Sequence, residues 1–150
     1  MPDITKIQVY LATADVAYAS AEGRVYLGIA GREFALRKQG SDTKHQQGEQ
    51  HTYTLGKDAD VAQAQYNDPA QPTLDTDDLD RYPVYIRFVP SGEQPAWCLE
   101  WVDVTVNPQA KIKHYFANPR LDGTDDKHRI WLDTEYGTVV HLKRNDQQVD

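Results

Sequence analysis

Hydrophobic and polar residues alternate along most of this chain, and a period of two residues is the pattern of a strand with one buried face. The clearest run spans residues 82–89, in which Val84, Ile86 and Phe88 fall on the same side. Comparable runs cover residues 6–13, 24–30, 34–36, 51–55, 97–106, 113–117, 129–133 and 138–142. We therefore expect about eight or nine strands, each near the usual length of ~5–6 residues.

A sustained helical period is absent from the sequence, because the best candidate, residues 57–66, owes its apolar content mainly to alanine. Many short strands separated by Gly and Pro favour an all-β fold, either a sandwich or a barrel. The dipeptide Tyr136-Gly137 lies between the last two strands and predicts a hairpin turn. The chain is expected to form one domain over residues 1–150, with a C-terminal extension over residues 129–150.

Three polar stretches are predicted to be loops: residues 39–50, 57–81 and 121–128. The second is the longest and is rich in aspartate, and a loop of more than ~12–15 residues in a compact domain is usually functional or mobile. Alternating carboxylates at residues 75–80 resemble a cation-binding loop, but the glycine and distal glutamate of an EF-hand are missing. A solvated acidic loop is the preferred interpretation, and the same holds for Asp122, Asp125 and Asp126.

Composition narrows the choice of partner and compartment. The net charge of -7 repels phosphate backbones, so no nucleic acid partner is expected. Cys98 is the only cysteine, which excludes an intrachain disulfide and suits a reducing compartment. No apolar run has the length of a signal peptide or a membrane span. These features predict a cytoplasmic protein, or one attached peripherally to a membrane.

Several segments in order resemble the PLAT, or lipoxygenase-homology, domain family. Its first turn and second strand are matched in spacing by residues 13–26, and its Gly-x-x-Asp-Thr-Phe-x-Leu strand by residues 48–55. Its Trp-Phe-Leu-Glu-x-Val-x-Val strand is similar to residues 97–104, and its final Trp-Leu element to Trp131-Leu132. The resemblance implies a PLAT-like β-sandwich of two antiparallel sheets with an extra C-terminal hairpin. This sequence departs from the family pattern in the longer loop 57–81 and in an insertion between Phe116 and Trp131.

The resemblance also implies a candidate calcium site, which is the one cofactor suggested. In calcium-binding members, ligands come from the first turn and from a His-Asp-Asn loop before the tryptophan strand. Asp15 and Glu22 occupy the first-turn positions, whereas the second loop offers only Glu93 as a carboxylate. Calcium needs six to eight oxygens. The alternative is that Asp15 caps a turn and that Glu22 is solvated.

A second candidate site is an apolar contact surface for lipid or for a protein partner. Val16 and Tyr18 are expected at the tip of the loop between the first two strands. Tyrosine and tryptophan favour the interface between lipid and water. Trp101 falls at the variable position of the tryptophan strand and is expected to face outward. The alternative is that Tyr18 packs on its own loop and that Trp101 fills a cross-strand pair.

No catalytic machinery is predicted. The five histidines lack a zinc-site spacing, none of the three serines sits in a Gly-x-Ser-x-Gly turn, and Cys98 lies in the middle of a strand. The resemblance implies a targeting module that binds membrane lipid or protein. The alternative is a protein-binding adaptor, inhibitor or immunity-type protein without lipid binding, because acidic surfaces steer basic partners. A carbohydrate-binding module is a third possibility that rests on analogy of fold alone.

Overall fold

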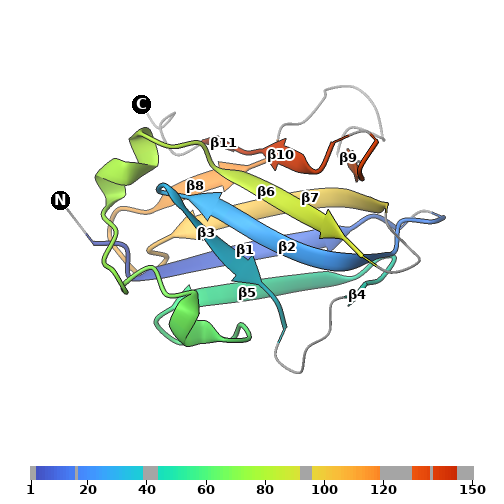
Figure 1. Ribbon diagram of the computed structural model, residues 1–150. Helices are drawn as coiled ribbons and strands as arrows, with labels where there is room; N and C mark the ends of the chain where they lie inside the picture. Colours follow the sequence, from blue (N-terminus) through green and yellow to red (C-terminus); the bar gives the residue numbers. More distant parts are fainter. Residues whose placement is uncertain are drawn as a thin grey trace.

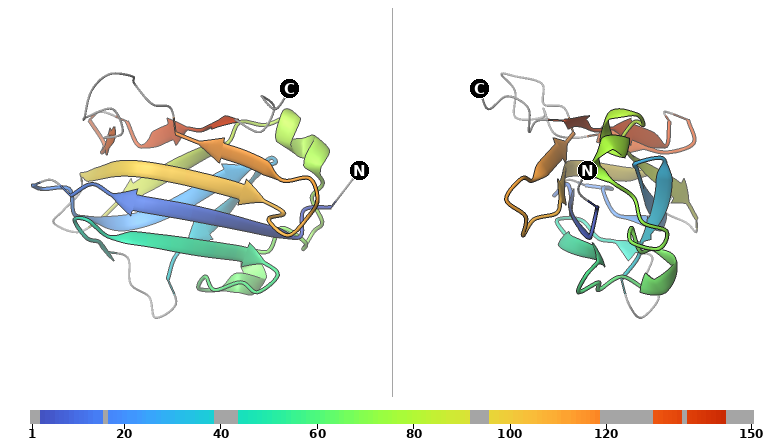
Figure 2. Two further views of the ribbon diagram at one scale, coloured as in Figure 1. Left: turned by 180° about the vertical axis from the view of Figure 1, so that it is seen from behind. Right: turned by 90° about the vertical axis from the view of Figure 1, so that its left-hand side faces the viewer.

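The computed structural model describes residues 3–15, 17–38, 44–91, 96–118, 130–135 and 137–144. Within these ranges the chain forms two antiparallel β-sheets, and its other regular elements are two short 3-10 helices. Figure 1 shows the strands running along the long axis of the molecule, and the right-hand view of Figure 2 shows the two layers from one end. The predicted all-β sandwich of two antiparallel sheets is confirmed.

The first sheet has the strand order β11-β8-β7-β1-β5, and β9 also pairs with β7. Its strands are β1 (Lys6–Thr13), β5 (Gln50–Gly56), β7 (Trp97–Val106), β8 (His114–Ala117), β9 (Ile130–Leu132) and β11 (Lys143–Arg144). Val9 marks the centre of this sheet, because it lies opposite Val104 on one side and Tyr53 on the other. β8 and β9 share one edge of β7, with β9 beside its first residues and β8 beside its last.

The second sheet has the order β10-β6-β2-β3, and β4 also pairs with β2. Its strands are β2 (Ala21–Ile29), β3 (Arg32–Leu36), β4 (Lys44–His45), β6 (Tyr85–Pro90) and β10 (Val139–His141). One side of β2 is covered by β6. Its other side changes partner, from β3 along Val25–Ile29 to β4 at Ala21 and Glu22.

The core between the sheets is built from the inward faces that the alternation predicts. Buried members are Ile7, Val9, Leu11, Val25, Leu27, Ile29, Phe34, Leu36, Tyr53, Leu55, Val84, Ile86, Phe88, Leu99 and Val104. Trp97 is fully buried, its ring centroid lies 5.4 Å from that of Phe88, and its indole nitrogen donates to Oγ1 of Thr13 at 2.9 Å. Full burial of a large apolar side chain contributes ~1.5–3 kcal/mol, so this layer dominates the stability.

The C-terminal extension differs in detail from a simple hairpin. The turn forms where expected, because Asp133 and Gly137 exchange two backbone hydrogen bonds of 3.0 Å. However, β9 then belongs to the first sheet and β10 to the second, so the extension ties one layer to the other. A local pattern marks a turn and two strands, but the free edges of the folded sheets decide which partners those strands take.

The long loop 57–81 is an ordered cover on the open edge of β3. It contains η1 (Ala64–Tyr66) and η2 (Thr76–Asp80). The side-chain oxygen of Asn67 accepts from the backbone N–H of Ala35 in β3 at 2.7 Å, and the N–H of Ala62 donates to the carbonyl of Arg37 at 2.8 Å. Because β3 is an edge strand, these bonds satisfy backbone groups that would otherwise be open to pairing with another chain.

The aspartates of this loop act locally as caps and ion-pair partners. Asp60 accepts from the backbone N–H of Thr54 at 2.8 Å. Asp75 and Asp78 form a capping box at the start of η2, which satisfies backbone donors that the helix itself leaves unpaired. Asp80 forms an ion pair with strand β11. The acidic stretch therefore fastens the loop to itself and to the sandwich.

Candidate functional site

The loop between β1 and β2 has a fixed base at one end of the first sheet. Ala14, Ala19 and Cys98 are fully buried and form a small apolar cluster of their own. The N–H of Ala14 donates to the carbonyl of Cys98 at 2.9 Å, and the N–H of Cys98 donates to the carbonyl of Ala19 at 3.3 Å. Both ends of the loop are therefore held against β7, and the residues between them are carried at the tip.

Tyr18 is the most exposed large hydrophobic residue of the described chain, with 89% of its surface accessible. Its backbone is in the left-handed region, with φ 66°. For a residue with a side chain this conformation costs roughly 1–2 kcal/mol. A strained, bulky and solvated residue at a loop tip gains nothing for the fold, which is a pattern typical of functional positions. Val16, its predicted companion, lies outside the described residues.

Trp131 is a second exposed aromatic at the same end of the sandwich. Its place in the sequence matches the final Trp-Leu element of the family, but it was not predicted as a contact residue. It lies directly opposite Cys98, and paired residues of antiparallel strands project from the same face. Since Cys98 packs against the base of the Tyr18 loop, Trp131 flanks that base, and its side chain is 40% exposed. Figure 1 shows the β1–β2 loop and β9 at the same end of the molecule.

Trp101 lies on the outer face of the first sheet, opposite Ala12 of β1. Its side chain is half-buried, and its indole nitrogen donates to a carboxylate oxygen of Asp103 at 2.7 Å. The register of β1 and β7 shifts between Ala12 and Thr13, so that Trp101 and Cys98 both turn away from the core. A role for Trp101 in contacting lipid or protein stays a prediction.

The predicted calcium ligands are placed as follows. Asp15 is exposed beside the tip loop and accepts from the side-chain amide of Gln47 at 3.0 Å. Glu22 is half-buried in β2, opposite Lys44 of β4. Glu93 lies outside the described residues. Within the described ranges, no group of three or more His, Cys, Asp or Glu side chains is assembled as a metal site, so calcium binding stays a prediction.

The outer face of the second sheet holds a satisfied ionic network. The guanidinium of Arg87 donates two hydrogen bonds of 2.8 Å to the carboxylate of Glu33, and the hydroxyl of Tyr85 donates to the same carboxylate at 2.7 Å. The hydrogen bond from Arg87 lowers the pKa of Glu33, and the bond to Glu33 raises the pKa of Tyr85. Every charge in this network has its partner within the chain, which favours a structural role.

The described residues also bear on membrane spanning and on thiol chemistry. None of the helices among them is long and apolar enough to cross a bilayer. The thiol of Cys98 is fully buried in the small apolar cluster, where it packs as a hydrophobic group.

Known proteins resemble this chain in structure, although comparisons of its sequence find no match. No protein-family model matches this sequence, and no curated protein matches it. The alpha-toxin of Clostridium absonum is similar with a TM-score of 0.57 and 22% identity, over 94% of this chain and 32% of the toxin. The alpha-toxin of an avian strain of Clostridium perfringens is similar with a TM-score of 0.55 and 19% identity, over 94% of this chain and 31% of the toxin.

A coral 8R-lipoxygenase, described as activated by calcium through a C2-like domain, is similar with a TM-score of 0.55 and 15% identity. That match covers 94% of this chain and 17% of the lipoxygenase. The chain thus spans less than a third of the length of each of these three proteins. At these identities the likeness concerns the fold alone, and it shows that this chain is folded as a PLAT-like β-sandwich.

Proposed function

We propose that this chain is a non-catalytic PLAT-like module that associates peripherally with a membrane surface, through the end of the sandwich that carries Tyr18. The observation that carries the proposal is the pairing of a rigid loop base with a strained, 89% exposed tyrosine at its tip. An aromatic ring with a polar hydroxyl suits the boundary between headgroups and acyl chains.

The neighbouring tryptophan supports the same end of the molecule. Trp131 adds a second partly exposed aromatic beside the loop base, and Trp101 lies farther along the same outer face. The similarity in fold to a lipoxygenase described as calcium-activated through a C2-like domain supports a surface-binding role. Calcium bridging by Asp15, Glu22 and Glu93 is the further part of this proposal, since the net charge of -7 opposes direct attraction to anionic lipid.

Co-sedimentation with lipid vesicles tests the proposal. Neutral and anionic vesicles are each used with calcium and with a chelator. The Tyr18→Ser variant is expected to bind about three- to tenfold more weakly, since removing one interfacial aromatic corresponds to ~1 kcal/mol. Ile112→Ser is the matched control, because Ile112 is 67% exposed but follows the opposite end of β7.

The outcomes separate the alternatives. Binding that requires calcium and is lost in Asp15→Asn supports the bridged form, whereas calcium-independent binding supports insertion of the aromatic tip alone. If Tyr18→Ser and Ile112→Ser bind as well as the wild type, the assigned contact is wrong. If no vesicle binds under any condition, the protein-binding adaptor or inhibitor replaces the lipid-binding module.

A further inference from the structure

A cavity of about 240 Å³ lies at the edge of the second sheet, where β2 exchanges β3 for β4 as its partner. Between these two partners, no strand among the described residues pairs with Gly23 and Arg24 of β2 on that side. The long loop closes the cavity from the other side with Ala62 and Gln63. This site is separate from the outer face of the first sheet that carries the aromatic tip.

Two arginines that line this cavity differ from the other arginines that the structure describes. The structure describes six arginines, and the side chains of four have partners in the chain: Arg32 with loop carbonyls, Arg81 with Asp78, Arg87 with Glu33 and Arg144 with Asp80. The side chains of Arg24 and Arg37 make no hydrogen bond or ion pair with the described residues, and both residues line the cavity. The Nε atom of Arg37 is buried without a hydrogen-bond partner. A buried, unsatisfied donor is costly to a fold and is expected where a ligand supplies the acceptor.

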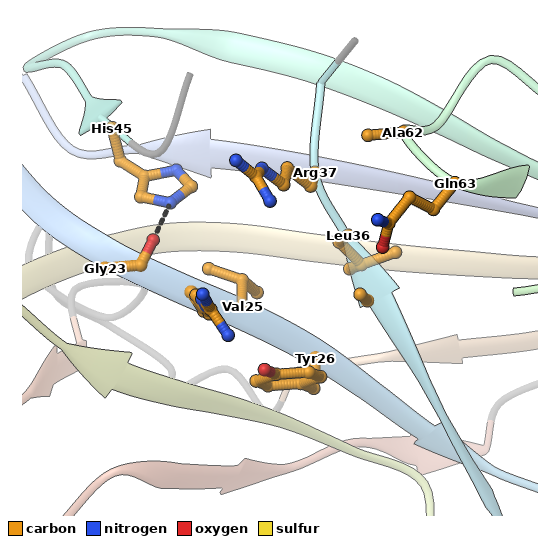
Figure 3. Close-up of a pocket in the computed structure, with 10 residues that line it drawn as sticks. Gly23, Val25, Tyr26, Leu36, Arg37, His45, Ala62 and Gln63 are labelled. Atoms are coloured by element: carbon orange, nitrogen blue, oxygen red, sulfur yellow. Dashed lines mark hydrogen bonds between the residues drawn. The ribbon is translucent and has the colours of Figure 1, made fainter. Parts of the chain in front are cut away.

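The backbone brings the cationic groups together. Val25 lies opposite Leu36 in the β2–β3 pair, so Arg24 and Arg37 follow as the next positions of the antiparallel register. The end of β3 is pinned, because the carbonyl of Arg37 accepts from the loop N–H of Ala62 at 2.8 Å. Figure 3 shows the Arg37 side chain extending from the end of β3 toward the ring of His45.

His45 completes the polar side of the cavity. Its Nε2 lies 3.4 Å from the carbonyl oxygen of Gly23, and its ring packs against the buried Trp97 with the centroids 4.9 Å apart and the planes tilted by 33°. The ring is therefore fixed by the core while one side remains at the cavity. Two arginines and the Gln63 carboxamide present hydrogen-bond donors, and none of the described lining residues is acidic.

The charge of the two arginines is not balanced by any of the described residues that line the cavity. In a protein of net charge -7, the cavity brings together two arginines, and its described lining includes no carboxylate. The planar fork of a guanidinium matches the oxygens of a phosphoryl group, and paired arginines bind such groups through charge-assisted hydrogen bonds. The remaining lining includes Val25, Leu36 and Ala62, which leaves an apolar side for a small organic substituent.

We propose that this cavity is a binding site for a phosphoryl group on a small organic moiety, held by Arg24 and Arg37. The same chemistry is offered by a soluble phosphate ester and by the headgroup of a phospholipid. The site does not depend on the aromatic tip, so it stands or falls separately from the proposed vesicle contact.

Chemical-shift titration of the full chain tests the site with three probes: inorganic phosphate, glycerol 3-phosphate, and vesicles of phosphatidylcholine containing phosphatidic acid. The amide signals of Gly23, His45 and Gln63 report on the cavity. Arg37→Gln and Arg24→Gln are expected to weaken binding by about tenfold or more, because each removes a charge-assisted contact. Arg81→Gln is the matched control, since it removes the same charge from an exposed arginine outside the cavity.

Arg24 is exposed, so its variant leaves the packing intact even if Arg37→Gln disturbs the fold. Shifts with phosphate or glycerol 3-phosphate that Arg24→Gln weakens and Arg81→Gln preserves support a soluble ligand. Vesicle binding alone with the same variant pattern supports a lipid headgroup. Absence of binding to all three probes, or equal weakening by Arg81→Gln, overturns the proposal.

Discussion

The two most prominent loops of this molecule are opposites. The loop between β1 and β2 is short and nearly uncharged, and its tip carries an exposed tyrosine with a left-handed backbone conformation. The loop at residues 57–81 is long and acidic, and it is bonded to β3 by Asn67, Ala62 and the guanidinium of Arg32. Length and charge draw attention to the second loop, but its polar groups are largely occupied within the chain.

The difference shows that unmet bonding capacity identifies a candidate site better than length or composition does. Several carboxylates of the long loop cap η2, accept from the backbone of β5 or pair with Arg144, so they are committed to the fold. Tyr18 contributes no burial and holds a strained backbone, and Arg37 keeps a buried donor unsatisfied. Groups that cost stability and return none are the ones for which a ligand provides a reason.

The largest expected effect comes from cutting the long loop away from β3. Asn67→Ala removes the acceptor for the Ala35 N–H and the donor to the carbonyl of Gln63, at a site that is 7% exposed. We expect a loss of roughly 2–3 kcal/mol in the free energy of unfolding, because buried backbone groups lose their partners. Urea unfolding measures it, with the exposed Gln65→Ala as the control. Unchanged stability would show that the loop is not fastened to β3 as described.

The second prediction compares two alanines of the tip loop that are two residues apart. Ala19→Leu overpacks the buried cluster with Ala14 and Cys98 and should destabilise the protein by about 1–3 kcal/mol. Ala17→Leu adds the same atoms at an exposed position, so stability should hold while vesicle binding rises several-fold. Thermal unfolding and co-sedimentation measure the two effects. Equal behaviour of the two variants would contradict the division into a fixed base and a free tip.

The third prediction sets stability against function at Tyr18. Glycine adopts a positive φ without strain, so Tyr18→Gly should stabilise the fold by about 1 kcal/mol at most, offset in part by a more flexible unfolded chain. The same variant should lose vesicle binding. A thermal melt and co-sedimentation on one preparation check both results. A less stable variant would mean that the tyrosine packs on its own loop.

The smallest expected effect concerns pH and the strand that the long loop covers. Because hydrogen bonding to Arg87 holds the pKa of Glu33 below its ordinary value of 4.5, the folded state favours the carboxylate. The ionised carboxylate of Glu33 therefore contributes to the free energy of unfolding above pH ~4.5. This contribution is lost as the pH falls through the lowered pKa of the folded state. The pair is about one-third exposed, so screening limits the effect to about 0.5 kcal/mol.

Glu33→Gln should therefore flatten the stability profile below pH ~4.5, relative to the wild type, when unfolding is followed in urea. Burial lowers the pKa of His51, so this residue also makes stability depend on pH. Both proteins contain His51, and its contribution therefore drops out of the difference between their profiles. Glu135→Gln is the control, since it removes an exposed carboxylate elsewhere. Parallel profiles for Glu33→Gln and the wild type would show that the network does not bias folding.

The alternation of side chains determined which residues enter the core. A period of two fixes the face on which a residue projects, so β1 and β7 were predicted with their observed bounds, and Val84, Ile86 and Phe88 were predicted to share the face that is buried. The turn closed by Asp133 and Gly137 was also predicted, because a turn depends on residues that are adjacent in the sequence. β4 and β11 have two residues each and are too short to show any period.

Only the tertiary structure decided which strands became neighbours. That choice placed Trp131 beside the Tyr18 loop, divided the last strands between two sheets, and opened the gap beside β2 where Arg24, Arg37 and His45 meet. The physical reason is that these juxtapositions join residues far apart in the chain. Their energies depend on pairing and packing, whereas the sequence pattern records only the face on which each residue lies.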